Sequence, residues 1–194
     1  MIGSKQVARV ALLAVVGTTS GALAQQPYHG PIIGANLAEG RRWGWGARPG
    51  ATIGGFGFFG GWRFESIRLG FVEHNIWWEG SRGIVLDFGG FASVDLASIW
   101  LDPQISAAIF GQIEPVARFK SNESAWAVAP SALFGGRAAG VEIGFAVTPE
   151  FWLSELPNNG NKLGVDLQVR FGCDIIELAH FIEHIKAANE PSTP

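Results

Sequence analysis

One stretch near the C-terminus constrains the fold more than any other. Residues 162–171 begin at Lys162 and end at Phe171, and from Gly164 onward apolar and polar residues alternate without a break. In an extended strand consecutive side chains point to opposite faces, whereas a helix cannot separate two such sets. The predicted strand therefore has an apolar face and a polar face. The apolar face consists of Val165, Leu167, Val169 and Phe171, and the polar face of Asp166, Gln168 and Arg170.

This pattern of a polar residue, a glycine and alternating apolar residues ending in phenylalanine resembles the terminal strand of small bacterial outer-membrane β-barrels. In such barrels the apolar side of each strand contacts lipid and the polar side lines the interior. The resemblance implies two partners: outer-membrane lipid, and the barrel assembly machinery, which would recognise the segment from Lys162 to Phe171. In most such barrels the phenylalanine is the last residue, whereas residues 172–194 follow it here.

The composition agrees with a β-sheet that contacts lipid on one of its faces. Charged residues make up only 16% of the 194 residues, whereas glycine occurs 27 times and tryptophan 8 times. This combination is unusual for a soluble enzyme. The formal net charge of -3 provides no basic surface, so we predict no nucleic-acid partner. The single cysteine, Cys173, cannot form an intrachain disulfide, and the fold itself must hold the exported chain together.

The first 24 residues are predicted to be a secretory signal peptide. Lys5 and Arg9 come before the apolar run 10–16, and small residues lead to an Ala-x-Ala site that ends at Ala24. The apolar run is shorter than the ~20 residues that a membrane-spanning helix needs. We therefore predict export, cleavage after Ala24 and localisation in the cell outer membrane.

The remaining chain divides into four predicted parts. Residues 25–49 lack a sustained period and are interpreted as an irregular lead-in. Residues 50–172 alternate with period two between turn residues, which predicts an all-β fold: a closed antiparallel up-and-down β-barrel of about eight strands. Within it, residues 62–72 are interpreted as one strand with a β-bulge near Ser66. Residues 173–188 are predicted to form a periplasmic amphipathic helix, and residues 189–194 a disordered tail.

The predicted helix has an apolar stripe that needs a cover. Asp174 is the predicted N-cap, and Glu177, three residues later, completes a capping box. The stripe could cover the mouth of the barrel, lie on the membrane surface or contact a periplasmic partner, and the sequence does not distinguish these options. Its residues are Ile175, Leu178, Ala179, Ile182 and Ile185.

Ten charged residues fall on the polar sides of the predicted strands. A barrel of about eight strands is just filled by its own side chains. Because both signs are present, we favour a self-neutralising internal network over the alternative of a selective pore. The predicted lumen network comprises Arg63, Glu65, Arg68, Asp87, Asp95, Glu114, Arg118, Glu142, Asp166 and Arg170.

Six tryptophans lie near predicted strand ends. In a membrane barrel, aromatic residues at those places form girdles at the two interfaces, and we predict this role over that of ordinary core aromatics. The predicted girdle comprises Trp62, Trp77, Trp78, Trp100, Trp126 and Trp152.

Two patterns could carry chemistry. His180, Glu183 and His184 match the H-x-x-E-H motif of inverted zinc peptidases, and the two histidines are four residues apart on the predicted helix. Zinc needs a further protein ligand, however, and only ten residues follow. We therefore interpret these three residues as a solvated helix edge, with a metal site as a weak candidate.

The second pattern centres on His74, the only histidine within the predicted barrel. A lipid-modifying enzyme would need a serine and an acid close to His74, but its neighbour Glu73 points to the opposite face.

We predict no catalytic residues and no cofactor. The expected role is non-catalytic: envelope structure, narrow passage or small-ligand binding. The main alternative is a soluble periplasmic β-barrel with a lipid-like ligand inside, in which Val165, Leu167, Val169 and Phe171 point inward. A lipid-modifying outer-membrane enzyme is a third hypothesis.

Overall fold

The structure, a computed structural model, describes residues 29–44, 50–78, 84–121, 124–153 and 163–189. The predicted signal peptide, 1–24, lies outside these residues. The described chain forms ten strands and one helix: β1 (His29–Gly44), β2 (Ala51–Phe64), β3 (Ile67–Trp78), β4 (Val85–Asp102), β5 (Ile105–Glu114), β6 (Val116–Lys120), β7 (Ala125–Val128), β8 (Ser131–Ala138), β9 (Val141–Trp152), β10 (Leu163–Asp174) and α2 (Ile175–Asn189).

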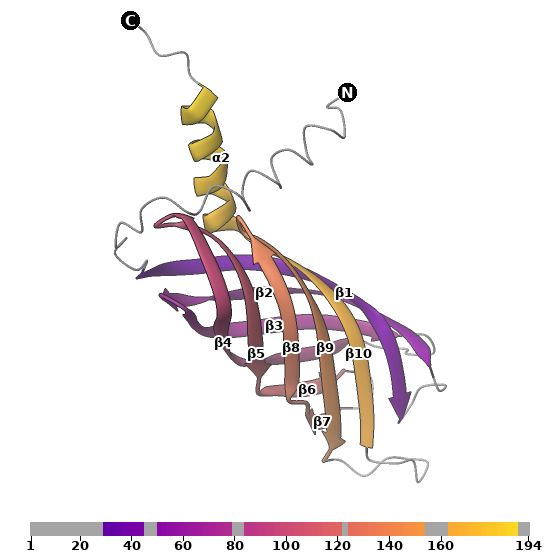
Figure 1. Cartoon of the computed structure of the whole chain (residues 1–194). Coiled ribbons are helices and arrows are strands. Elements are labelled where there is room, and N and C mark those ends of the chain that lie inside the picture. Colours follow the sequence, from indigo (N-terminus) through magenta and orange to yellow (C-terminus); the bar gives the residue numbers. More distant parts are fainter. Residues whose placement is uncertain (1–28, 45–49, 79–83, 122–123, 154–162, 190–194) are drawn as a thin grey trace, which may run out of the picture.

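The sheet closes on itself as a barrel. All pairings are antiparallel, and neighbours in sequence pair from β1 to β5 and then through β8 and β9 to β10. The first strand closes the ring against the last, from Gly34 opposite Asp174 to Gly44 opposite Gly164. Figure 1 shows β10 between β9 and β1.

Two prolines explain why ten strands form an eight-stranded barrel. Pro115 separates β5 from β6, and both of these segments pair with β4. Pro130 lies between β7 and β8, which both pair with β9. Proline has no N–H to donate to a ladder, so each proline interrupts one strand without ending it. With each interrupted strand counted as one, the prediction of about eight strands is confirmed.

The interpretation of residues 62–72 as one bulged strand is wrong. The strand β2 ends at Phe64, residues 65 and 66 form a tight turn, and β3 runs back from Ile67. Glu65 has a φ of 54°, in the left-handed region that the first residue of some two-residue hairpin turns requires. Glycine is the usual residue at such a position, so the sequence lacked the signal that marks this turn.

The interpretation of residues 25–49 as an irregular lead-in is also corrected, because His29–Gly44 is strand β1. Its register explains its unusual composition. A Cβ atom on Gly40 would lie 1.9 Å from the carbonyl oxygen of Leu167 on β10, so the close approach of the two strands requires glycine here. Gly40 lies on the inner face with Arg42, so it interrupts the alternation of polar and apolar residues by which a strand is recognised in sequence.

The helix continues directly from the last strand. It spans Ile175–Asn189, close to the predicted 173–188, and Figure 1 shows it rising from the end of the barrel at which β10 ends. Asp174 is the N-cap, since its Oδ1 accepts hydrogen bonds from the N–H groups of Ile176 and Glu177 at 3.1 and 3.3 Å. No helix among the described residues is long and apolar enough to cross a membrane.

Candidate functional site

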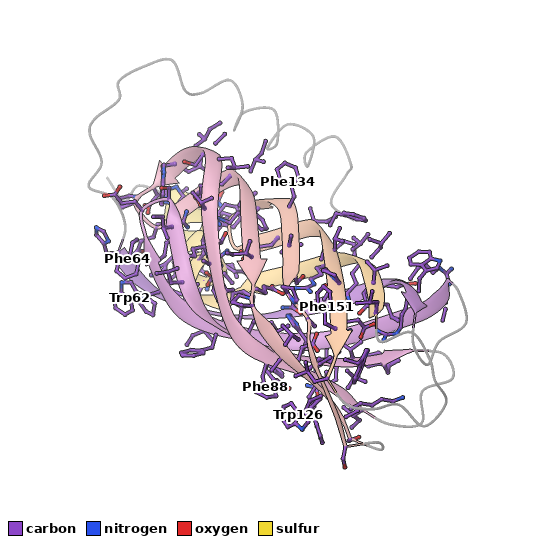
Figure 2. All side chains as sticks on the ribbon, turned by 90° about the horizontal axis from the view of Figure 1, so that it is seen from below. Trp62, Phe64, Phe88, Trp126, Phe134 and Phe151 are labelled. Atoms are coloured by element: carbon purple, nitrogen blue, oxygen red, sulfur yellow. The ribbon has the colours of Figure 1, made fainter. Side chains whose placement is uncertain are left out.

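Along the strands, side chains alternate between the inside and the outside of the barrel, as the sequence pattern of the terminal strand predicts. On β10, Asp166, Gln168 and Arg170 point inward and are at most 4% exposed, whereas Val169 and Phe171 are 40% and 54% exposed on the outside. On the other strands, phenylalanine, isoleucine and tryptophan side chains likewise cover the outer wall, and the interior holds apolar side chains such as Ile53, Phe91 and Phe110 beside the charged ones. In Figure 2 the labelled aromatic side chains lie on the outside of the ribbon. The inward orientation that the soluble-barrel alternative requires of Val169 and Phe171 is therefore wrong.

One group of charges lies across the lumen near the end of the barrel away from α2. Arg118 donates to both carboxylate oxygens of Asp87 at 2.7 Å, and its Nη1 also donates to Asp166 and Glu150 at 2.7 and 3.0 Å. Arg42 donates to Asp166 at 2.9 Å and forms an ion pair with Glu150. All five side chains are at most 1% exposed. We name this group the loop-end cluster; it joins strands β1, β4, β6, β9 and β10 across the lumen.

A second group fills the end of the barrel next to α2, and we name it the helix-end cluster. Its basic members each contact carboxylates: Arg63 contacts Asp95 at 3.2 Å, Arg68 pairs with Glu142, and Arg137 pairs with Asp95. The guanidinium of Arg63 also lies 4.4 Å from the centre of the Trp100 ring. The cluster comprises Arg63, Arg68, Asp95, Arg137, Glu142, Asp174 and Glu177.

Glu177 brings the helix into this cluster. Its Oε1 accepts hydrogen bonds from the backbone N–H and the hydroxyl of Ser106 at 2.8 and 3.0 Å, and its Oε2 lies 3.3 Å from Arg63. The predicted capping box is thus half right: Asp174 caps the helix, but the Glu177 carboxylate points into the barrel mouth. The first turn of α2 therefore contributes the Glu177 carboxylate to one end of the lumen. The apolar stripe of the helix does not cover the mouth, because Ile175, Ile182 and Ile185 are 55%, 45% and 43% exposed.

Between the two clusters lies a smaller polar group around a cavity. Arg170 donates to Glu114 at 2.6 Å and to the Ser131 hydroxyl at 3.2 Å, and His74 Nε2 lies 3.5 Å from Glu114. A cavity of about 30 Å³ lies beside Arg170, lined by Phe59, Phe91 and Phe110 among others. A space of this size holds about two water molecules and no organic solute.

His74 lacks the arrangement that a lipid-modifying enzyme would need. It is buried on the inner face, and the acid nearest to its ring is Glu114. Among the described residues no serine hydroxyl forms a hydrogen bond with it; the Ser131 hydroxyl instead accepts from Thr148 at 2.9 Å and from Arg170. Glu73 points outward, as its position next to His74 predicts.

Nine of the ten predicted lumen charges lie inside the barrel. The exception is Glu65, which belongs to the β2–β3 turn and is exposed because residues 62–72 are not one strand. The inner wall also contains charged residues that the prediction omitted. One of them is Arg137; the others are Arg42, which was assigned to the lead-in, and Asp174 and Glu177, which were assigned to the helix. Glu150 could have been found, because it continues the period-two series of Glu142, Gly144, Ala146 and Thr148.

The predicted tryptophan girdle is only partly on the outer wall. Trp62, Trp77 and Trp126 are 44%, 52% and 44% exposed. Trp152 is instead buried inside against Ala125 and Ala127, and Trp100 is half-buried against Arg63. These two assignments are corrected, since period two from the inward Glu150 and Thr148 places Trp152 inward. The side chain of Trp78 lies outside the described residues.

The metal candidate on α2 consists of separated side chains. His180 Nδ1 lies 4.0 Å from Glu183, whereas His184 Nδ1 lies 3.8 Å from Asp102 on β4. Over the part of the chain that the structure describes, no three His, Cys, Asp or Glu side chains are grouped so that they could hold a metal ion.

Comparison with known proteins identifies the fold and no family. No family profile matches the sequence, and no curated protein matches it. The crystal structure of Neisserial surface protein A is similar to this chain, with a TM-score of 0.51 and 10% sequence identity, over 76% of this chain and 99% of that one. At this identity the likeness supports the β-barrel fold alone.

Proposed function

We propose that this chain is an exported outer-membrane β-barrel with a closed lumen and a non-catalytic role, either in envelope structure or in binding a small apolar molecule. The proposal rests mainly on how the side chains are divided: large apolar side chains cover the outer wall, whereas the buried charges lie inside, where they pair with one another. In water the outer wall would expose a continuous band of large apolar side chains, which monomeric soluble proteins rarely do. In a bilayer the same band faces hydrocarbon.

The closed lumen argues for a role at the surface of the barrel. The loop-end cluster crosses the lumen with buried ion pairs, Glu177 and its partners cover the other end, and the cavity between them accommodates only water. Passage of a solute would require both clusters to open. We therefore expect no stable single-channel conductance from the purified protein in planar bilayers. Steady ion-conducting steps would contradict a closed lumen.

Localisation can be tested with the full chain in a Gram-negative host. We expect it in the outer-membrane fraction after a carbonate wash, and we expect the unboiled protein to migrate faster on a denaturing gel than the boiled protein. Recovery of the chain from the aqueous periplasmic fraction without detergent would contradict the proposal. In this orientation α2 lies in the periplasm, where its exposed Ile182 and Ile185 are available to a partner or to the membrane surface.

The terminal strand is proposed to serve as the recognition segment for the assembly machinery. We expect Phe171→Ser to reduce assembled protein in cells while the purified variant still folds in detergent. A matched variant is Phe145→Ser on β9, because Phe145 is 51% exposed on the same outer wall and Phe171 is 54% exposed. Equal assembly of the two variants would contradict the recognition role.

A further inference from the structure

The outer wall of β2, β3 and β4 contains a hollow that lies apart from the lumen. Phe58, Glu73 and Phe88 lie side by side across the three strands, and the adjacent row consists of Gly60, Phe71 and Gly90. The hollow formed over these rows has a volume of about 550 Å³. The hollow is shallow and open, so a molecule bound there would contact protein on one side and the surrounding lipid on the other. In Figure 2 the labelled Phe88 lies on the outer side of the ribbon.

The packing of the barrel does not require the two glycines at the base of this hollow. A Cβ atom on Gly60 would lie 3.8 Å from its nearest neighbour, and one on Gly90 would lie 3.5 Å away, both ordinary contacts. By contrast, a Cβ atom on the inward Gly61 or Gly89 would lie 2.1 or 2.3 Å from a backbone carbonyl oxygen. The outward glycines therefore leave open space around Phe71, which is 80% exposed.

A carboxylate lies at one side of this apolar hollow. Glu73 is half-buried midway along β3, and one of its oxygens accepts a hydrogen bond from the side-chain amide of Asn75 at 2.7 Å. Among the described residues, no basic side chain forms an ion pair with Glu73. An acidic side chain on the lipid-facing side of a membrane strand is costly and by default suggests a function.

We propose that this hollow binds a membrane-dissolved amphiphile with a protonated amine. The inference rests on the proposed function, because it requires the outer wall to face hydrocarbon. The apolar body of the ligand lies against Phe71 and over the two glycines, and its ammonium donates to the Glu73 carboxylate. The rings of Phe58 and Phe88 on either side of Glu73 add a second attraction, since aromatic faces favour cations.

The test uses full-length protein folded into phosphatidylcholine nanodiscs and two photoreactive probes. One is a long-chain alkylamine with a diazirine in its chain, and the other is the alcohol of the same length with the same diazirine. After irradiation, mass spectrometry maps the labelled peptides. In the wild type we expect amine labelling to concentrate on the peptides of β2 to β4, well above labelling by the alcohol.

Two kinds of variant separate the carboxylate from the hollow. Glu73→Gln should reduce amine labelling about tenfold, to the level of the alcohol, which is the loss expected for one charge-assisted hydrogen bond. Gly60→Leu with Gly90→Leu should block labelling of these peptides by both probes. The matched control is Gly136→Leu on β8, where an added Cβ also has space, 3.7 Å from the Ala108 carbonyl oxygen; it should leave labelling unchanged.

The outcomes distinguish failure of the site from failure of the proposed function. Even labelling around the barrel, equal labelling by amine and alcohol, or an unchanged Glu73→Gln would overturn the ligand site if heat-modifiable migration is intact. Crosslinking of one chain to another through the hollow would overturn it too, because a second copy would then be the occupant. If the wild type does not insert into bilayers at all, the proposed function fails with it.

Discussion

The inner and outer walls of this barrel are made of the same strands but differ in how much each residue is constrained. On the inner wall, Arg118 contacts three carboxylates, and neighbouring strands approach so closely that Gly61 admits no side chain. On the outer wall, Phe71 and Phe145 project away from the sheet, and Gly60 has space beside it. Specific pairing therefore stabilises the inside, whereas outside the hollow around Glu73 most outward positions need only to be apolar. Matched substitutions on the two walls test this difference.

The largest effect is expected from Arg118→Met. Removal of this side chain leaves Asp87, Glu150 and Asp166 buried with less positive charge, a change that costs about 3–5 kcal/mol. We expect the urea midpoint of the barrel in lipid vesicles, followed by tryptophan fluorescence, to fall accordingly. Arg41→Met is the outer-wall control, because Arg41 is exposed on β1, where it pairs with Thr52. Equal shifts for the two variants would contradict the comparison.

A charge on the outer wall is the next test. Phe145 lies in the middle of β9, and we expect Phe145→Arg to destabilise the barrel in a bilayer by about 2–4 kcal/mol, the cost of a cationic side chain facing lipid near the midplane. Phe145→Leu keeps the position apolar and should change stability by much less. If both variants unfold at the same urea concentration in vesicles, Phe145 does not face hydrocarbon.

Adjacent glycines offer a test of packing. We expect Gly61→Ala to cost about 1–3 kcal/mol, since the added methyl group would lie 2.1 Å from the Leu69 carbonyl oxygen and 2.6 Å from the Gly70 Cα. Gly60→Ala should be close to neutral, because its methyl group would make only an ordinary contact, 3.8 Å from the Ile32 carbonyl oxygen. Urea titration of both variants in vesicles checks this, and the reverse order of stability would show that we have assigned the two residues to the wrong walls.

A smaller effect is expected at the mouth of the barrel. Glu177→Ala removes the acceptor of the Ser106 N–H and hydroxyl and a partner of Arg63, a loss of about 1–2 kcal/mol. We expect the barrel to stay closed while α2 becomes more sensitive to limited proteolysis. Glu183→Ala, at an exposed position on the same helix, should have no such effect. Equal protease resistance of wild type and Glu177→Ala would mean that Glu177 does not hold the helix.

The smallest effect is a gain. Glu65 has a positive φ, which glycine adopts at lower cost, so Glu65→Gly should stabilise the barrel by up to about 1 kcal/mol. The neighbouring Ser66 provides the control, since its φ is not in the left-handed region and Ser66→Gly should not stabilise. A loss of stability in Glu65→Gly would indicate that the exposed carboxylate has a role of its own.

The sequence predicts the division between the walls well because period two is a property of each strand by itself. Asp166, Gln168 and Arg170 could be assigned to the interior from their own ten-residue segment. The sequence predicts structure poorly at positions whose conformation depends on contacts with another strand. Gly40 belongs to a strand because Leu167 lies against it, and Glu65 lies in a turn that lacks the usual glycine.

In the lumen, too, the sequence predicts which residues point inward but not which of them contact one another. Arg118 and Asp87 were both predicted to point inward, but their bidentate pairing depends on the register of β4 against β6. Glu177 was predicted to belong to a helix cap, and only the packing of α2 on the barrel end directs it toward Ser106. The outer hollow could not be predicted, because it combines residues of three strands in one register.

The most direct test of the account is the environment of the outer wall in a bilayer. Nitroxide labels would be placed at Phe134, Phe145 and Val169, one at a time, on cysteines introduced into a Cys173→Ser background. Collision rates with oxygen, which dissolves in hydrocarbon, would be compared with those of a water-soluble nickel chelate. We predict high oxygen and low nickel collision rates at all three positions. Low oxygen and high nickel collision rates would place these side chains in water and contradict the central claim.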